Sequence, residues 1–287
     1  MILKYFAALI LALLPALIWL IIWYKKDSSQ PEPKKLIFRS FIFGVLGIMP
    51  FLGINFALNR ADALQEIWVI FTKKTFFIST IFLTLILAFL EESIKHFSVL
   101  RLGKSLKVYF DQIVDGIIYS VSAALGFAFA ENVFYFLEAF FALGISVDFL
   151  KVFLFRSFGT MFAHTIFSGL FGFFWSFAFL SKKITPHHNI SVSLMWKKIT
   201  ETIRFHIIFS HILKGRTSTR GHEKRELVAE ALLLATLLHA VFNLLIKTEI
   251  FGHSLTFLVV PILMGGFLYL SKKFLENKNL KIWKKPL

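Results

Sequence analysis

Long apolar stretches separated by short polar ones dominate the pattern of this chain. A membrane-spanning helix needs about 20 mostly apolar residues. Seven stretches meet that template: residues 2–24, 36–58, 76–100, 113–137, 151–180, 228–247 and 251–271. The pattern therefore predicts an all-α polytopic transmembrane helix bundle with about seven spanning helices. Lys25 and Lys26 follow the first stretch where a signal peptide would have a small-residue cleavage site, so we expect a retained anchor.

The polar segment 181–227 contains one further periodic stretch. Apolar and basic residues alternate through residues 192–209, which is typical of a basic amphipathic helix lying on a membrane surface. We therefore predict a cytoplasmic amphipathic helix here. It is either a substrate-facing or regulatory element, or a linker that rests on lipid.

The Lys and Arg residues are unevenly distributed among the predicted loops. Segment 181–227 holds ten of them and the tail after residue 271 holds six, with further basic residues at 25–35 and 101–107. The loops between these are poorer in positive charge. Because basic loops stay in the cytoplasm, we predict a multi-pass cell-membrane protein with its N-terminus outside and its C-terminus cytoplasmic.

Composition narrows the class of protein further. Hydrophobic residues make up 57% of the 287 and aromatic residues 17%, which excludes a soluble domain of ordinary composition. The net charge of +15 follows from the basic loops and favours contact with anionic membrane lipid, so we expect no nucleic-acid partner. The absence of cysteine excludes disulfides, a thiolate nucleophile and cysteine metal ligands.

Polar residues inside the predicted spans are the strongest functional signal. They are Glu91, Glu92 and Lys95, then Glu131 and Asn132, then Arg156 and His164, and finally His239 and Asn243. A charged residue at the centre of a spanning helix costs roughly 2.5–3.5 kcal/mol on insertion scales. Four helices that accept this cost predict a buried polar site facing the bundle interior. Glu131 reaches the depth of the others if its helix is longer than 113–137, tilted, or broken at Gly126.

The adjacent pair Glu91 and Glu92 suggests acid–base chemistry. Two neighbouring carboxylates in a low-dielectric environment cannot both ionise cheaply, so one of them is suited to take a proton from water and return it to a leaving amine. Lys95 lies on the same helix face and can hold the ionised partner. The alternative is an intrahelical ion pair near the cytoplasmic boundary.

The two histidines suggest a second part of the same site. Arg156 and His164 are eight residues apart, which is close to two helical turns, so they share a face. Glu131, His164 and His239 are adequate ligands for a catalytic zinc ion. The same groups can instead orient water and stabilise an oxyanion without metal, with Asn243 in a supporting role.

Three other protease signatures fit poorly. His222-Glu223 lies in a polar segment and lacks the second histidine of the H-E-x-x-H zinc motif. Ser168 follows Phe167 rather than the G-x-S-G of rhomboid-type serine proteases. Asp115 precedes a glycine, whereas presenilin-type aspartyl proteases need G-x-G-D.

Five short motifs occur in order over about residues 88–245. They are Glu91-Glu92-x-x-Lys95, Asp111-x-x-x-Asp115-Gly116, Gly126-Phe127-x-x-x-Glu131-Asn132-x-x-Tyr135, Arg156 followed by His164, and His239-x-x-x-Asn243. Together they resemble the PrsW family of membrane-embedded endopeptidases, part of the CAAX-protease-like superfamily. The resemblance implies an intramembrane protease that cuts a membrane-anchored partner, with the glutamate pair and the membrane histidines as catalytic residues. Anti-sigma factors are the substrate type known for that family.

This resemblance divides the chain into three parts. We expect an N-terminal two-helix segment at 1–75, a catalytic membrane core at 76–247 that includes loop 181–227, and a last spanning helix with a basic tail at 248–287. The competing hypothesis is a non-enzymatic membrane protein, either an ion-coupled transporter or a catalytically silent scaffold, because intramembrane Glu, His and Lys also form proton relays. Transporters usually contain two related halves, and the sequence shows no such repeat.

Overall fold

The computed structural model describes residues 2–25, 31–60, 62–101, 109–110, 113–180, 220–247, 249–250 and 253–254. These residues are almost entirely helical, which confirms the all-α prediction for them. The helices are α1 (Ile2–Tyr24), α2 (Lys34–Arg60), α3 (Asp62–Arg101), α5 (Ile113–Ala142), α6 (Val147–Leu154), the π-helix η1 (Phe155–Thr160), α7 (Met161–Leu180) and α10 (Arg220–Lys247). The two-residue strands β1 (Glu249–Ile250) and β2 (His253–Ser254) form a small antiparallel pair.

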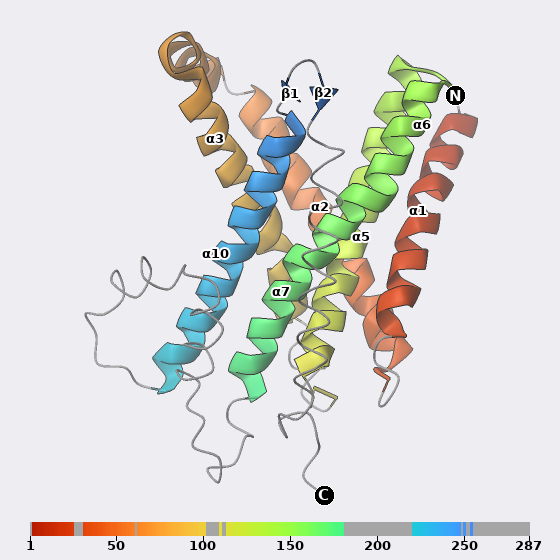
Figure 1. Cartoon of the computed structure of the whole chain (residues 1–287), viewed down its shortest axis with the longest axis vertical. Helices are drawn as coiled ribbons and strands as arrows, with labels where there is room; N and C mark the ends of the chain where they lie inside the picture. Colours follow the sequence, from red (N-terminus) through yellow and green to blue (C-terminus); the bar gives the residue numbers. More distant parts are fainter. Residues whose placement is uncertain are drawn as a thin grey trace, which may run out of the picture.

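The long helices run side by side and alternate in direction (Figure 1). The start of α1, the α5–α6 connection and the β1–β2 pair lie at the same end of the bundle. One contact at that end joins Lys4 Nζ to the Phe140 carbonyl oxygen at 3.0 Å. Successive long helices therefore end at opposite ends of the bundle, as expected of helices that cross a membrane back and forth.

Four helical segments are long and apolar enough to cross a membrane by length and composition. They are Ile2–Tyr24, Lys34–Gly53, Val114–Ala142 and Val228–Ile246. The predicted span 151–180 begins earlier, at Val147, and consists of α6, η1 and α7 in succession. The predicted span 251–271 and the predicted amphipathic helix lie outside the described residues, except that β2 occupies 253–254. The count of seven spans therefore stays a prediction.

Helix α5 lies at the centre of the bundle because small residues let its neighbours approach closely. A Cβ atom added to Gly126 would lie 2.0 Å from the Phe41 carbonyl oxygen of α2. A Cβ atom on Gly172 of α7 would lie 2.2 Å from the Gly116 carbonyl oxygen. Such backbone contacts are the usual way in which helices pack inside a membrane.

The length of α5 determines the depth of Glu131. The helix continues without a break through Gly126 and ends at Ala142, five residues beyond the predicted end. Gly126 is thus a point of close packing rather than a hinge. Glu131 lies eleven residues before the end of the helix, or about 17 Å along its axis. Of the three predicted ways for Glu131 to reach the depth of the other polar residues, the longer helix is therefore the one observed.

Candidate active site

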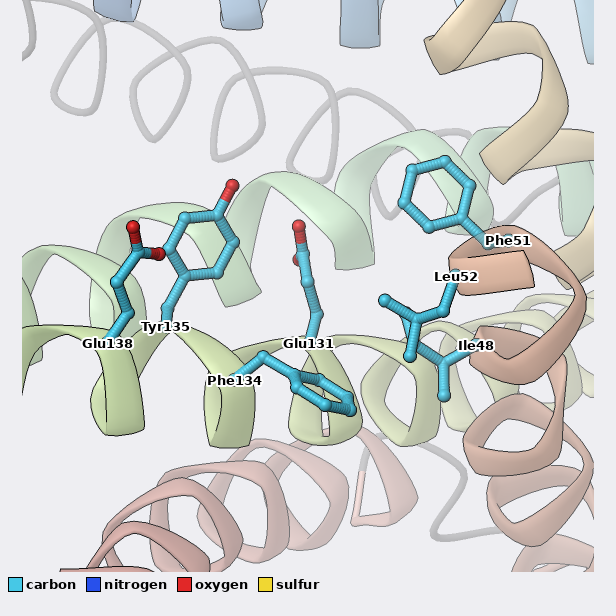
Figure 2. A pocket seen from close by; sticks show the side chains of 7 residues that line it. All are labelled: Ile48, Phe51, Leu52, Glu131, Phe134, Tyr135 and Glu138. Atoms are coloured by element: carbon cyan, nitrogen blue, oxygen red, sulfur yellow. The ribbon is translucent and has the colours of Figure 1, made fainter. Parts of the chain in front are cut away.

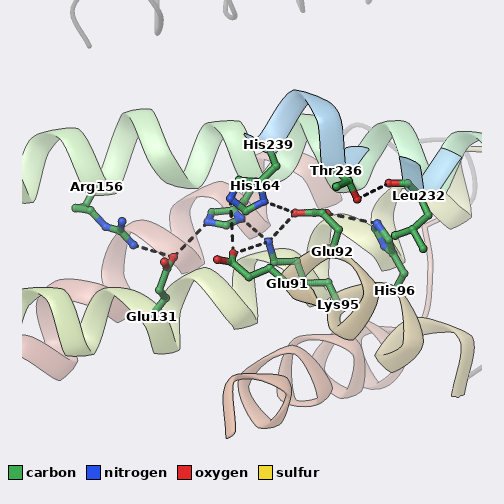
Figure 3. A network of polar contacts seen from close by, with 10 residues as sticks. All are labelled: Glu91, Glu92, Lys95, His96, Glu131, Arg156, His164, Leu232, Thr236 and His239. Atoms are coloured by element: carbon green, nitrogen blue, oxygen red, sulfur yellow. Dashed lines mark hydrogen bonds and ion pairs between the residues drawn. The ribbon is translucent and has the colours of Figure 1, made fainter. Parts of the chain in front are cut away.

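Helix α3 contributes Glu91, Glu92 and Lys95 to a buried polar network (Figure 3). Lys95 Nζ lies 2.8 Å from Glu92 Oε1 and 3.6 Å from Glu91 Oε2. The spacings of three and four residues place all three side chains on one face of the helix. The Lys95 side chain is fully buried, so its charge depends on these carboxylates for compensation.

Helix α10 brings His239 against the two carboxylates. Its Nδ1 atom lies 2.8 Å from Glu92 Oε1, and its Nε2 atom lies 3.6 Å from Glu91 Oε2. The ring stacks on Phe167 of α7, with centroids 5.3 Å apart. A carboxylate on one imidazole nitrogen fixes the ring and leaves the other nitrogen available, which is the arrangement found around metal-binding histidines. Here the available nitrogen faces Glu91.

Helix α7 contributes His164, which connects two groups of charges. Its Nδ1 atom lies 2.8 Å from Lys95 Nζ, and its Nε2 atom lies 3.3 Å from Glu131 Oε2. An ammonium group can only donate, so Nδ1 accepts from Lys95 and the neutral ring carries its proton on Nε2. This assignment of the tautomer directs the N–H toward Glu131.

Helix α5 and the π-helix η1 form the outer part of the network. Arg156 Nη2 lies 2.8 Å from Glu131 Oε2, and Arg156 Nε donates to Asn132 Oδ1 at 2.7 Å. The guanidinium also lies over the Tyr135 ring, 3.7 Å from its centroid. Arg156 lies inside η1, and π-helical turns of this kind frequently occur at functional sites because they redirect a side chain.

The central residues of the network are removed from solvent. Glu91, Glu92, Lys95, His164 and His239 are each 6% exposed or less. Within the part of the chain that the structure describes, Glu91 Oε2 makes no hydrogen bond. Buried polar atoms almost always have a partner, so an unsatisfied carboxylate oxygen beside two histidines indicates a place for a missing group.

The structure brings together eight of the nine residues that the sequence singled out. They are Glu91, Glu92, Lys95, Glu131, Asn132, Arg156, His164 and His239. The ninth, Asn243, is half-buried one turn beyond His239, and the contacts described for the chain do not include it in the network.

His96 is a member of the network that the sequence analysis did not select. Its Nε2 atom lies 3.4 Å from Glu92 Oε2, and its ring stacks on Phe171 with centroids 3.4 Å apart. The signal was available in the sequence, because His96 follows Glu92 by one helical turn. It therefore flanks Glu92 on the side opposite His239.

The residues best placed to hold a metal ion are Glu91, His164 and His239. One ligand atom from each lies within 4.8 Å of the others, and all three are buried. This set shares both histidines with the predicted set but contains Glu91 in place of Glu131. Glu131 stays a predicted ligand, although its ion pair with Arg156 makes Glu91 the better candidate.

The side chains of Glu91, His164 and His239 are suitable ligands for Zn²⁺ or a similar divalent ion. Two imidazoles and one carboxylate are a known ligand set for catalytic zinc. Glu91 Oε2 lacks a hydrogen bond among the described residues, and Glu92 already fixes His239 through Nδ1. His164 would have to exchange its contact with Lys95 or with Glu131 for the ion.

The comparison with known proteins identifies the family. Residues 32–213 match the model of the PrsW family intramembrane metalloproteases. The chain belongs to the PrsW family. The match includes α2, which we expected outside the shared core, and it ends before His239. The place of His239 in the site therefore rests on its contacts with Glu91 and Glu92.

Several curated relatives bear the name Protease PrsW. The relative from Bacillus subtilis (strain 168) is 34% identical over 130 residues, which is 45% of this chain and 54% of that protein. The relative from Geobacillus kaustophilus is 32% identical over 165 residues, 56% of this chain and 62% of that protein. The Oceanobacillus iheyensis relative is 31% identical over 210 residues, 71% of this chain and 81% of that protein. The chain thus spans less than two thirds of the length of the first two. No solved structure matches it significantly.

Proposed function

We propose that this chain is an intramembrane endopeptidase that hydrolyses a peptide bond of a membrane-anchored protein. The observation that carries the proposal is the unsatisfied Glu91 Oε2 atom, buried within 3.6 Å of both His239 Nε2 and Lys95 Nζ. Membership of the PrsW family supports the same chemistry. A carboxylate in these surroundings is suited to bind and activate a water molecule.

The reaction needs one proton acceptor and donors for the oxyanion. A water molecule beside Glu91 loses a proton to the carboxylate, and its oxygen bonds to the scissile carbonyl carbon. Lys95, whose Nζ atom lies 3.6 Å from Glu91 Oε2, is close enough to donate a hydrogen bond to the oxygen that becomes negative. The C–N bond then breaks, and the proton held by Glu91 passes to the leaving amine.

Glu92 acts on the other residues rather than on the substrate. Its Oε1 atom holds both Lys95 Nζ and His239 Nδ1 at 2.8 Å, so it fixes the positions of an ammonium group and an imidazole together. Glu131 holds His164 in a similar way and is itself fixed by Arg156. The two acidic residues are thus positioning groups on either side of the reacting centre.

The same residues also suit a zinc ion, which would use Glu91 as a ligand in place of its role as proton acceptor. Glu91, His164 and His239 would hold it, and its positive charge would polarise the water and the scissile carbonyl. Without metal, Glu91 alone takes the proton from water. Both versions assign Glu91 and the two histidines to the centre of the site.

The substrate class and the location follow from the environment of the site. A site enclosed by apolar helices is suited to bind and cut the chains of other membrane-anchored proteins. The alternating helices of Figure 1 support a multi-pass membrane protein, and the basic loops favour an N-terminus outside and a C-terminus inside. An anti-sigma factor as substrate stays a prediction from the family resemblance.

Purified protein in liposomes tests the proposal directly. We expect the full chain to cleave co-reconstituted single-pass membrane proteins, and we expect Glu91→Gln to lose cleavage while it inserts normally. The exposed carboxylate Asp148, paired with Lys151 on the surface, provides the matched control Asp148→Asn. Equal activity of wild type and Glu91→Gln, or uptake of ions without cleavage, would favour the transporter hypothesis instead.

A further inference from the structure

A cavity of about 180 Å³ lies between α2 and α5, next to the candidate site (Figure 2). Its walls, among the side chains that the structure describes, are formed by Ile48, Phe51 and Leu52 from α2 and by Glu131, Phe134, Tyr135 and Glu138 from α5. The α2 wall is thus apolar, and the α5 wall carries two carboxylates and a phenol beside the Phe134 ring. The mechanism proposed above uses only Glu131 from this set.

The polar wall forms a continuous stripe along α5. Glu131, Tyr135 and Glu138 are spaced by four and three residues, and Figure 2 shows their side chains rising from the same side of the helix. Glu138 lies four residues before the helix ends at Ala142, about 6 Å along the axis, whereas Glu131 lies about 17 Å from that end. The stripe therefore connects the end of the helix with the site.

The inner end of the cavity is lined by Glu131, a partly exposed member of an ion pair. The side chains of Glu131 and Arg156 are 15% and 12% exposed, although they form an ion pair well inside the bundle. Charged groups at this depth cannot face hydrocarbon without a large cost, so their exposed parts must face water or other polar groups. A cavity of this size has room for water molecules, each of which occupies about 30 Å³ in the liquid.

We propose that this cavity is the path by which water reaches the active site from the extracytoplasmic side. The inference rests on the proposed hydrolysis, which consumes one water molecule for each bond cut. Water at the inner end meets Glu131, whose Oε2 atom lies 3.3 Å from His164 Nε2. The stripe from Glu138 to Glu131 supplies hydrogen-bonding groups where lipid-facing helices would otherwise offer none.

The absence of cysteine from the chain makes the path directly testable. Single cysteines at Leu52 and Glu138 are exposed to a membrane-impermeant sulfonated methanethiosulfonate added outside intact cells or right-side-out vesicles. This reagent reacts with thiolates, which form in water and not in hydrocarbon. Met49→Cys is the matched control, because Met49 lies on α2 outside the lining of the cavity and is 64% exposed.

We expect Leu52→Cys and Glu138→Cys to react from outside roughly tenfold or more faster than Met49→Cys, since only the first two face water. All three variants should react fully in denaturing detergent. Modification of Leu52→Cys should also slow cleavage relative to the unmodified variant. Equal slow labelling of Leu52→Cys and Met49→Cys, or labelling of Leu52→Cys only from the cytoplasmic side, would overturn the proposed path. Because labelling needs no substrate, its result is independent of whether the protein is a peptidase.

Discussion

At the scale of single residues, the two adjacent glutamates have different surroundings. Glu92 Oε1 contacts Lys95 and His239 at 2.8 Å, whereas Glu91 Oε2 has its nearest described polar partners at 3.6 Å. A carboxylate that holds two other groups is a structural member of the network. Glu91, which makes no contact of that closeness through Oε2, is open to water, a metal ion or substrate.

The two glutamine variants should therefore differ in stability although both lose activity. Removing one partner of a buried ion pair typically costs about 3–5 kcal/mol, so we expect Glu92→Gln to lower the free energy of unfolding by an amount of this order. Glu91→Gln should lower it much less, because the contacts of Glu91 Oε2 with Lys95 and His239 are longer, at 3.6 Å. Cleavage should fall by about 10²-fold or more in both.

Thermal unfolding in detergent and a cleavage assay measure the two effects separately. Asp148→Asn is again the control, because its exposed pair with Lys151 should contribute only about 0–1 kcal/mol. Equal destabilisation by Glu91→Gln and Glu92→Gln would contradict the division of roles between the two carboxylates.

A metal ion at the site is the second prediction at this scale. If Glu91, His164 and His239 hold zinc, His164→Ala and His239→Ala should each lose the bound metal when the purified proteins are analysed by elemental analysis. A chelator should then inhibit the wild type, and added zinc should restore its activity. His206→Ala, at a histidine of the polar segment 181–227 in the sequence, is the control for nonspecific metal binding.

Catalysis by Glu91 without a metal ion predicts different results in the same experiments. If the glutamate acts without metal, the wild type should contain no stoichiometric metal and chelators should leave its rate unchanged. Both histidine variants should still be impaired, because His164 and His239 contact Lys95 and Glu92.

At the scale of helices, the site depends on close packing around α5. The backbones of α2 and α5 meet at Gly44, where an added Cβ atom would lie 1.9 Å from the Ala123 carbonyl oxygen. A backbone oxygen cannot move away from such a contact without moving its whole helix. This packing places α2 against α5 along the same interface as the cavity beside Glu131.

Two alanine substitutions in α2 should therefore have opposite effects. Gly44→Ala should strongly destabilise the protein, because the helices must separate to admit one methyl group. Gly53→Ala is the matched control: it lies in the same helix, and its added Cβ atom would meet nothing within 4 Å among the described residues. Alanine favours a helix over glycine by about 1 kcal/mol, so this variant should be neutral or slightly stabilised. Unfolding midpoints in detergent distinguish the two, and similar midpoints would contradict the packing argument.

At the scale of the whole molecule, the orientation in the membrane is a separate prediction. The basic loops predict that the end of α1 near Lys25 lies in the cytoplasm and that the α5–α6 connection lies outside. Ile145 in that connection is 94% exposed. Ile145→Cys should react with an impermeant thiol reagent outside intact cells, and Lys25→Cys should react only after the membrane is opened.

Reporter fusions provide an independent measurement of the same arrangement. A fusion after Leu287 or within 181–227 should report a cytoplasmic location, and a fusion within 59–75 should report an outside location. A cytoplasmic signal from the 59–75 fusion would overturn the alternation of spans on which the orientation rests.

Most of the helices, the polar residues within them and the family could be predicted from local features of the chain. Whether a stretch can enter a membrane is a local property of its apolar residues, so α1 and α2 could be predicted close to their observed bounds, and α10 at its C-terminal end, although α10 begins eight residues earlier than predicted. A glutamate or histidine inside such a stretch is equally visible without a structure. The order of these motifs was specific enough to indicate the PrsW family, which the family match then confirmed.

Which of these groups come into contact depends on how the helices pack against one another. Helical periodicity shows that Glu91 and Lys95 share a face, but the rotation and crossing of one helix against another depend on contacts between distant segments, such as Gly44 with Ala123. For this reason the sequence did not show that Glu91 faces both histidines while Glu131 is paired with Arg156. Neither the π-helical turn around Arg156 nor the role of Gly126 in close packing has a local signature, because both result from how neighbouring helices fit together.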